Sequence, residues 1–400
     1  MKNIVICCDG TWKKSDDVNA SNIEKIARVV DTRRHDGVDQ IVYYNAGVGT
    51  GATRFERLAG GAFGLGLDEA IVSCYRFLAL NYEVGDHVYV FGFSRGAYTA
   101  RSLIGMIDRL GLLTPTGVAR NLLPQAIELY RGRLPMVSRP AHFAGSGTAP
   151  DPTELEAARA AFRAHCHDSR DVIIRFLGVM DTVGTLGVPG LTNRRYRFHN
   201  VDLCTSVVTA RHALAIHERR RAFAPAVWTA PPTPPGTAAP ETPDVKQVWF
   251  DGVHSDVGGG YADCGLSDTV LRWILGEAAV CGLVIDDDLL AIVAPPDGVL
   301  VLHDSMTGWY RAANLLGVLT GVFRAAARTG GRFRLGWRVM EVRRGEHDDL
   351  AIMIWDPAYQ RSIARQDGSF RSGRNVFAWY GILERIPVSV DLRRERSTPR

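Results

Sequence analysis

The stretch that most constrains the fold runs from residue 87 to residue 111, where an apolar segment turns directly into a helical one. "HVYVFGF" (87–93) is a short apolar run typical of a buried parallel strand. "RGAYTARSLIGMIDRLG" (95–111) carries apolar residues at helical spacing. Ser94 lies between them in a Gly-x-Ser-x-Gly pattern. This arrangement predicts a nucleophile elbow, a sharp turn that exposes the serine hydroxyl.

The rest of the chain repeats the alternation of strand and helix. The other predicted buried strands are "NIVICC" (3–8), "IVYYN" (41–45), "VIIRFLGV" (172–179) and "VKQVWF" (245–250). The other predicted helices cover 66–82, 153–166 and 266–282. Such alternation predicts an α/β fold with a mostly parallel central sheet and helices on both faces, and the elbow makes it α/β-hydrolase-like.

The pattern becomes less regular after about residue 290, with short strand-like runs at 298–303 and 350–355. We therefore expect a catalytic core over 1–290 and a C-terminal extension over 291–400 that packs on it. Two further segments predict exposed loops: 133–154 and the proline-rich 230–244.

Composition excludes several classes of protein. The chain is 46% hydrophobic with a net charge of only +4, which is typical of a soluble globular protein. The basic runs 219–221 and 393–396 lack interleaved aromatics, so we interpret them as solvated and expect no nucleic-acid partner. Seven unclustered cysteines without a C-x-x-C pair argue against a disulfide framework and a zinc ribbon.

The chain begins without a signal-peptide pattern and contains no apolar run long enough to span a bilayer. We therefore expect a cytoplasmic location, with export only by a route that needs no signal peptide.

A serine hydroxyl becomes a nucleophile when a histidine takes its proton and a carboxylate orients that histidine. Asp181 comes directly after the strand 172–179, and His254 lies four residues past the strand 245–250. The chain order serine, acid, histidine is that of α/β hydrolases. The sequence therefore predicts the triad Ser94, Asp181 and His254.

Two alternatives remain open within this reading. Asp256 is a second candidate for the triad acid, and His303 is a second strand-end histidine that could act as the base. His199, His212 and His217 fall near or on a predicted helix and are interpreted as structural.

The oxyanion of acyl transfer needs two backbone donors. We expect one from Arg95, at the helix N-terminus, and the other from Gly10 or Thr11, in the loop after the first strand. Asp9 could instead position that loop by accepting its amides. This chemistry requires neither a metal nor an organic cofactor, and the glycine-rich stretch 46–51 lacks the spacing of a phosphate-binding loop.

Six motifs in order resemble a known family. They are "IVICCDGTW", "VYYNAGVGTG", "NYEVGDHVYVFGFSRGAYTAR", "GVMDTVGTLG", "ARHALAIHERRRAF" and "VWFDGVHSDVGGGY". Together they look like the bacterial family of α/β-hydrolase domains of unknown function that includes type VI secretion phospholipase effectors. The resemblance covers roughly residues 1–290.

The resemblance implies a serine hydrolase, with lipolytic members that cleave acyl esters of glycerophospholipids. It places the elbow serine on Ser94, the strand-end aspartate on Asp181 and the histidine of the "HSD" motif on His254. The chain departs from the family at Asn45, where aspartate is more common, and at His217, where an acidic residue is more common.

We therefore expect a serine hydrolase that forms an acyl-enzyme from a carboxylic ester, with a small molecule, a phospholipid or another lipid as substrate. The alternative is a non-catalytic protein on the same fold that binds a ligand or a partner. The segment 310–329 has an apolar face flanked by arginines, so it could contact a membrane surface transiently or pack on the core. The sequence does not identify a protein partner.

Overall fold

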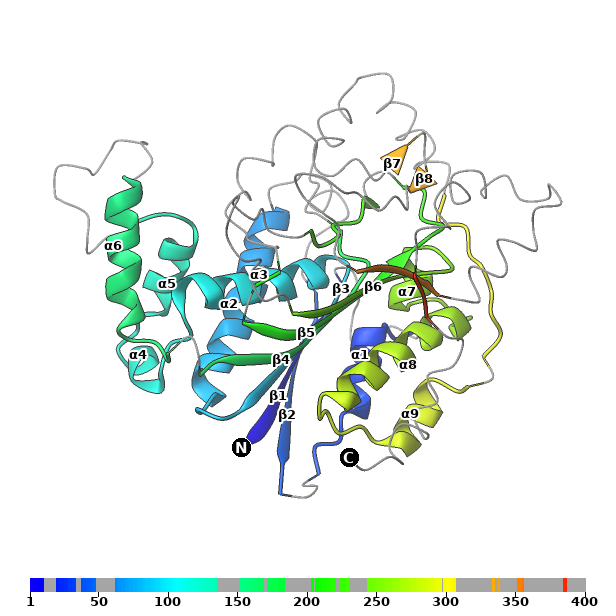
Figure 1. Cartoon of the computed structure of the whole chain (residues 1–400), viewed down its shortest axis with the longest axis horizontal. Coiled ribbons are helices and arrows are strands. Elements are labelled where there is room, and N and C mark those ends of the chain that lie inside the picture. The colour runs from blue at the N-terminus through cyan, green and yellow to red at the C-terminus, as the bar shows by residue number, and fades with distance from the viewer. Residues whose placement is uncertain are drawn as a thin grey trace.

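The computed structural model centres on one eight-stranded sheet (Figure 1). The residues it describes are 1–10, 19–33, 37–47, 62–134, 151–168, 171–183, 203–204, 206–220, 223–229, 243–296, 298–306, 333–334, 337–338, 351–355 and 384–386. The strands of the sheet are β1 (Lys2–Cys8), β2 (Asp39–Asn45), β3 (His87–Phe93), β4 (Ile173–Met180), β5 (Val207–Ala215), β6 (Asp244–Phe250), β9 (Ile352–Trp355) and β10 (Glu384–Ile386). A separate antiparallel pair consists of β7 (Phe333–Arg334) and β8 (Trp337–Arg338).

The strand order is β10-β9-β6-β5-β4-β3-β1-β2, and every neighbouring pair is parallel. β2 lies on one side of β1 and β3 on the other, so the direction in which the sheet grows reverses between β1 and β3. In open parallel sheets, ligands bind at the carboxyl ends of the strands beside such a reversal. The topology therefore predicts a ligand site at the carboxyl ends of β1 and β3.

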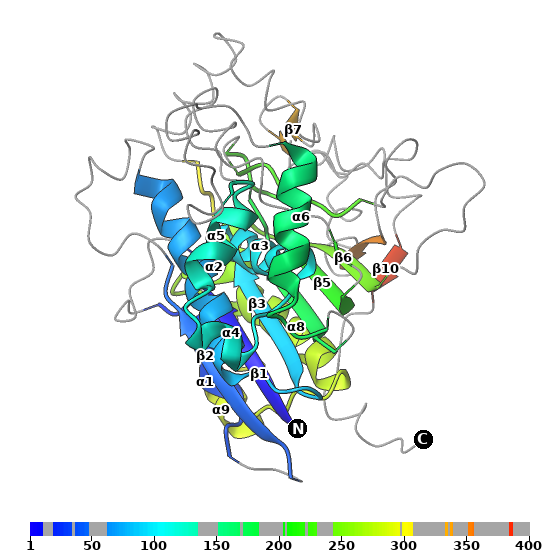
Figure 2. The ribbon, with the colours of Figure 1, turned by 90° about the vertical axis from the view of Figure 1, so that its left-hand side faces the viewer.

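Helices cover both faces of the sheet (Figures 1 and 2). The helices are α1 (Asn22–Val29), α2 (Ala62–Asn81), α3 (Arg95–Leu110), α4 (Pro115–Ala119), α5 (Leu123–Tyr130), α6 (Pro152–Arg163), α7 (His254–Gly258), α8 (Gly265–Val280) and α9 (Asp287–Val293). On one face α1, α8 and α9 contribute to the hydrophobic core, and on the other α2, α3, α5 and α6 do so.

Each central strand is buried on both sides. Along β1, Val5 and Cys7 belong to one core cluster while Ile4 and Ile6 belong to the other. Two buried faces explain why these strands are apolar runs without alternation. The predicted α/β fold with a mostly parallel sheet and helices on both faces is confirmed.

Some element predictions are wrong. Residues 298–303 form no strand, and His212 lies within β5 and not on or near a helix. β5 does not form an apolar run in the sequence, because it contains Thr209, Arg211 and His212. All three side chains are nevertheless buried. Tertiary partners satisfy them: Arg211 pairs with Asp244 and Glu277, for example.

The C-terminal part of the chain contributes to the sheet, because β9 pairs with β6 and β10 pairs with β9. The boundary at residue 290 stays a prediction. Most of the two predicted loops (133–154 and 230–244), most of the stretch 46–51, all of 310–329, and His199 lie outside the described residues. No helix in the described part of the chain is long and apolar enough to cross a membrane.

Candidate active site

Ser94 occupies a strained turn between β3 and α3. Its backbone has φ 59° and ψ −119°, in the positive-φ region that side chains other than glycine rarely adopt. The Ser94 amide donates to the carbonyl of Met180 at the end of β4, 3.0 Å away. This is the backbone geometry of a nucleophile elbow.

The two glycines of the motif are required by close backbone packing. A Cβ atom added at Gly92 would lie 2.6 Å from Cα of Ala97, and one added at Gly96 would lie 2.1 Å from the carbonyl oxygen of Cys8. Both distances are below any real Cβ contact. The elbow can therefore form between β1, β3 and α3 only with glycine at these positions.

Asp181 follows β4 directly and also has a positive φ, of 42°. Its amide donates to Ala213 at 2.7 Å, and its Oδ1 accepts from the amide of Ala215 at 3.1 Å. These bonds to β5 aim the other carboxylate oxygen, Oδ2, at Nδ1 of His254, 2.5 Å away. The predicted contact between this acid and this histidine is present.

His254 begins α7, and its buried ring lies between two aromatic rings. The ring centroid of Phe93 is 4.7 Å away and that of Phe223 is 4.8 Å away. Burial lowers the pKa of His254 below its ordinary value, although the hydrogen bond to Asp181 opposes this shift. The neutral ring with its proton on Nδ1, toward Asp181, leaves Nε2 as the proton acceptor.

The contact that joins the elbow to His254 is made by Phe93, the residue before Ser94, whose ring packs against the His254 ring. Within the described residues, no hydrogen bond joins Ser94 Oγ to the His254 ring. Catalytic hydrogen bonds of this kind often form only when substrate is bound.

The loop after β1 lies against the elbow. A Cβ atom added at Gly10 would be 3.5 Å from Cβ of Ser94, so the Gly10 backbone packs on the serine. The Gly10 amide donates to Asp9 Oδ1 at 2.6 Å, and Asp9 Oδ2 accepts from Tyr44 at 2.7 Å and from the hydroxyl of Ser21. Asp9 thus positions this loop, as the alternative interpretation proposed.

The amide of Gly10 is engaged within its own loop, which weakens its case as an oxyanion donor. Thr11 lies outside the described residues. Arg95 is the first residue of α3, so its amide lies at the helix N-terminus beside Ser94.

The two alternative candidates, Asp256 and His303, pair with each other through their side chains. His303 Nδ1 lies 2.6 Å from Asp256 Oδ1, and the His303 ring stacks on Tyr261 with centroids 3.9 Å apart. Asp256 Oδ2 also accepts the amide of Val253 at 2.9 Å. In the described structure neither residue bonds to the ring of His254.

Sequence reasoning missed Glu218, a fully buried carboxylate just after β5. Its Oε2 accepts the backbone amide of His254 at 3.2 Å. Arg220 forms a two-pronged pair with it, at 2.9 and 2.8 Å, and is only 14% exposed in its side chain. The interpretation of the basic run 219–221 as solvated is therefore wrong for Arg220. The position of Glu218 just past the end of a strand gave no signal in the sequence, because β5 does not form an apolar run.

His217 adds another link at this edge. Its Nδ1 accepts the amide of Gly252 at 2.9 Å, which ties the exit of β5 to the loop that carries His254.

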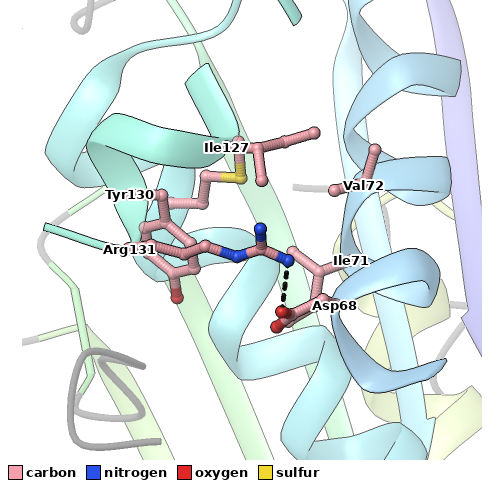
Figure 3. Close-up of a pocket in the computed structure, with 7 residues that line it drawn as sticks. Asp68, Ile71, Val72, Ile127, Tyr130 and Arg131 are labelled. Carbon is pink, nitrogen blue, oxygen red and sulfur yellow. Dashed lines mark hydrogen bonds and ion pairs between the residues drawn. The ribbon is translucent and has the colours of Figure 1, made fainter. Parts of the chain in front are cut away.

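Within the described residues no cluster of three or more His, Cys, Asp or Glu side chains could hold a metal ion. A separate small hollow lies between α2, α3 and α5 (Figure 3). Its polar feature is the ion pair of Arg131 with Asp68, at 2.5 Å. The hollow is lined by Met106 near the far end of α3 and by no predicted site residue.

A parallel sheet with a serine elbow and an aspartate–histidine pair at its carboxyl edge defines an α/β-hydrolase-like protein. Residues 2–277 match the family model described as "T6SS, Phospholipase effector Tle1-like, catalytic domain", where T6SS denotes the type VI secretion system. The chain belongs to this family, which confirms the resemblance found in its motifs.

The chain is also similar to individual proteins, at sequence identities of 16% to 30%. The chain is 30% identical over 244 residues to the uncharacterized protein YEL023C of Saccharomyces cerevisiae, covering 58% of this chain and 33% of the relative. A crystal structure of an uncharacterized protein from Pseudomonas aeruginosa matches with a TM-score of 0.42 and 16% identity, over 83% of this chain and 51% of that one.

The structure of a Tle1 effector bound to the VgrG spike of the type VI secretion system matches with a TM-score of 0.35 and 17% identity. It covers 66% of this chain and 51% of that one. The chain thus spans about a third of the curated relative and half of each of these two solved chains.

Proposed function

We propose that the protein is a serine hydrolase that cleaves a carboxylic ester of a lipid, with phospholipids as the favoured substrate class. The observation that carries this proposal is the 2.5 Å contact between Asp181 and His254 beside the strained Ser94. Membership of a phospholipase effector family supports the substrate class. All three residues lie beyond the carboxyl ends of strands in one parallel sheet, namely β3, β4 and β6, which supports a shared site.

The reaction proceeds through an acyl-enzyme. Nε2 of His254 takes the proton of Ser94 Oγ as Oγ bonds to the acyl carbon. The resulting oxyanion is held by backbone amides, for which we propose Arg95 and Thr11. The tetrahedral intermediate then collapses, its bond to the alcohol breaks, and the alcohol leaves with the proton from His254. In the second half of the reaction, His254 takes a proton from water as the water oxygen bonds to the acyl carbon. The bond from that carbon to Ser94 Oγ then breaks, Oγ regains the proton from His254, and the fatty acid leaves.

The surroundings of His254 suit this cycle. Burial between Phe93 and Phe223 favours the neutral ring that accepts a proton. Asp181 stabilises the imidazolium that forms in each step, and its hydrogen bond fixes the tautomer. The site therefore balances a free base at the start against a stabilised cation in the transition state.

A non-catalytic binding protein on this fold is the second candidate. It is favoured by one observation: the described residues include no hydrogen bond from Ser94 to His254. Under this candidate Ser94 would be unreactive in the folded protein.

For the full-length protein, family membership supports export by the type VI route without a signal peptide.

The test is hydrolysis of phospholipid vesicles and of short-chain esters by the purified chain and by Ser94→Ala. The proposal expects fatty acid release by the wild type and its loss in a Ser94→Ala variant with an unchanged circular dichroism spectrum. Equal release by both proteins would refute it.

A further inference from the structure

The carboxylate of Glu218 joins three segments that are distant in the sequence. From the exit of β5 it accepts the amide of Arg220 at 2.7 Å, and from α7 it accepts the amide of His254 at 3.2 Å. From the segment 298–306 it accepts the hydroxyl of Ser305 at 3.1 and 3.2 Å. The carboxylate has no exposed surface, so these contacts replace its hydration.

The segment 298–306 holds the start of α7 at a second point. Two residues before Ser305, His303 bonds through its ring to Asp256 at 2.6 Å. Asp256 in turn accepts the amide of Val253, the residue before His254. The consecutive amides of Val253 and His254 thus each donate to one of two buried carboxylates, and one short segment contacts both.

The charges of Glu218 and Arg220 also lie close to the His254 ring. Arg220 stacks over Phe223 at 3.7 Å from the ring centroid, and Phe223 meets the His254 ring edge-on. Two residues of opposite charge from the exit of β5 therefore lie near His254. Glu218 accepts its backbone amide, and Arg220 stacks on the aromatic ring that packs against it.

We propose that Glu218 is a positioning residue for the proposed base: it holds the first residue of α7 by its amide and, together with Arg220, sets the charge balance around the His254 ring. This inference rests on the proposed function, in which His254 acts as the base. It assigns a role to a carboxylate outside the triad and to an arginine whose sequence context indicated only a solvated surface.

Glu218 and Arg220 shift the pKa of His254 in opposite directions. Burial is the main cause that lowers the pKa of His254, Asp181 and then Glu218 raise that pKa, and Arg220 lowers it. Other titratable groups on the elements around α7 are Asp251, Asp256, His217 and His303. Removing the charge of Glu218 should lower the pKa of His254, whereas removing that of Arg220 should raise it.

The informative variants are Glu218→Gln and Arg220→Met. Glutamine retains one oxygen that can accept the His254 amide, while its NH2 group takes the place of the oxygen that accepts from Arg220. The first variant therefore removes the charge and weakens the pair with Arg220. Glu277→Gln is the matched control, because Glu277 is also a largely buried carboxylate paired with an arginine of β5, Arg211, at 2.6 Å. It bonds to none of the site residues among the described contacts.

The experiment is a pH titration of ¹³C-labelled histidine by NMR, with the His254 signal assigned from its loss in His254→Gln. We expect the pKa of His254 to fall in Glu218→Gln and to rise in Arg220→Met, each by roughly half a unit or more. Glu277→Gln should match the wild type. This readout needs no substrate, and a purely structural role would not produce shifts of opposite sign.

Kinetics complete the test. In Glu218→Gln we expect kcat for ester hydrolysis to fall by about tenfold to a hundredfold with little change in KM, and the acid limb of the pH profile to move to lower pH. A His254 pKa that is unchanged in both variants, or that shifts equally in Glu277→Gln, would overturn the inference. A wild type without Ser94-dependent hydrolysis would reject the proposed function instead, while the titration would still decide the role of Glu218. If Arg220→Met fails to fold, Arg220→Lys, in which the charge stays, should leave the His254 pKa close to that of the wild type.

Discussion

His254 Nδ1 lies 2.5 Å from Asp181 Oδ2, although the two residues are 73 positions apart in the chain. The contact is possible because β4, β5 and β6 are adjacent and parallel, so their carboxyl ends meet at one edge of the sheet. Asp181 follows the first of these strands and His254 the last. The fold thus brings a carboxylate and a histidine together beside the serine elbow.

Replacing Asp181 by asparagine should reduce activity far more than stability. The neutral side chain of asparagine could not stabilise the imidazolium, and its amide group could reverse the tautomer of His254. We expect kcat for ester hydrolysis to fall by about 10³-fold to 10⁴-fold. The measurement is steady-state hydrolysis with circular dichroism as a control for folding. Loss of less than tenfold would show that Asp181 is not the triad acid.

His254 and His303 should differ sharply in importance. His303 bonds to Asp256 and stacks on Tyr261, so it supports the segment around α7 without meeting the serine. His254→Gln should abolish hydrolysis to the level of Ser94→Ala, whereas His303→Gln should retain activity within about tenfold of the wild type. The opposite order would make His303 the base.

The pH profile should reflect the lowered pKa of His254. Because burial favours the neutral ring, the free enzyme should keep its base unprotonated to below pH 6.5, the ordinary pKa of histidine. As the pH falls through the lowered pKa, the ring gains a proton and kcat/KM decreases. A profile of kcat/KM between pH 4 and pH 9 checks this. An acid limb centred above 6.5 would contradict the burial argument.

Gly96→Ala should destabilise the protein by about 3 kcal/mol or more, at the upper end for overpacking, because the new Cβ would meet the Cys8 carbonyl at 2.1 Å. Gly85→Ala is the control. At Gly85 a new Cβ would meet nothing within 4 Å, and the substitution is strained only because the backbone there has a positive φ of 97°, which alanine rarely adopts. Its cost should be only about 1–2 kcal/mol. Urea denaturation of both variants measures the difference, and equal losses would mean that the elbow tolerates the added atom.

Local patterns predicted the parts of the site that depend on local structure. The run 87–93 followed by a serine between glycines specifies the elbow, because strand, turn and helix are contiguous. The pairing of Asp181 with His254 could also be predicted, since chain order and strand ends place both at one edge of a parallel sheet.

Other parts depend on contacts that the sequence does not display. Glu218 follows β5, whose buried Arg211 and His212 look polar until their partners on neighbouring elements are known. The pair of Asp256 with His303 requires the segment 298–306 to pass beside α7, and no pattern indicates that path. The bond from Gly10 to Asp9 likewise depends on the conformation of one loop.

The most direct test of the account is a map of fluorophosphonate labelling by peptide mass spectrometry on the folded wild type, with Ser94→Ala and His254→Gln alongside. The account predicts a single adduct on the peptide that contains Ser94, no adduct in Ser94→Ala, and a strongly slowed reaction in His254→Gln. A wild type that stays unlabelled, or that carries the adduct on another residue, would contradict the claim that Ser94 is the nucleophile.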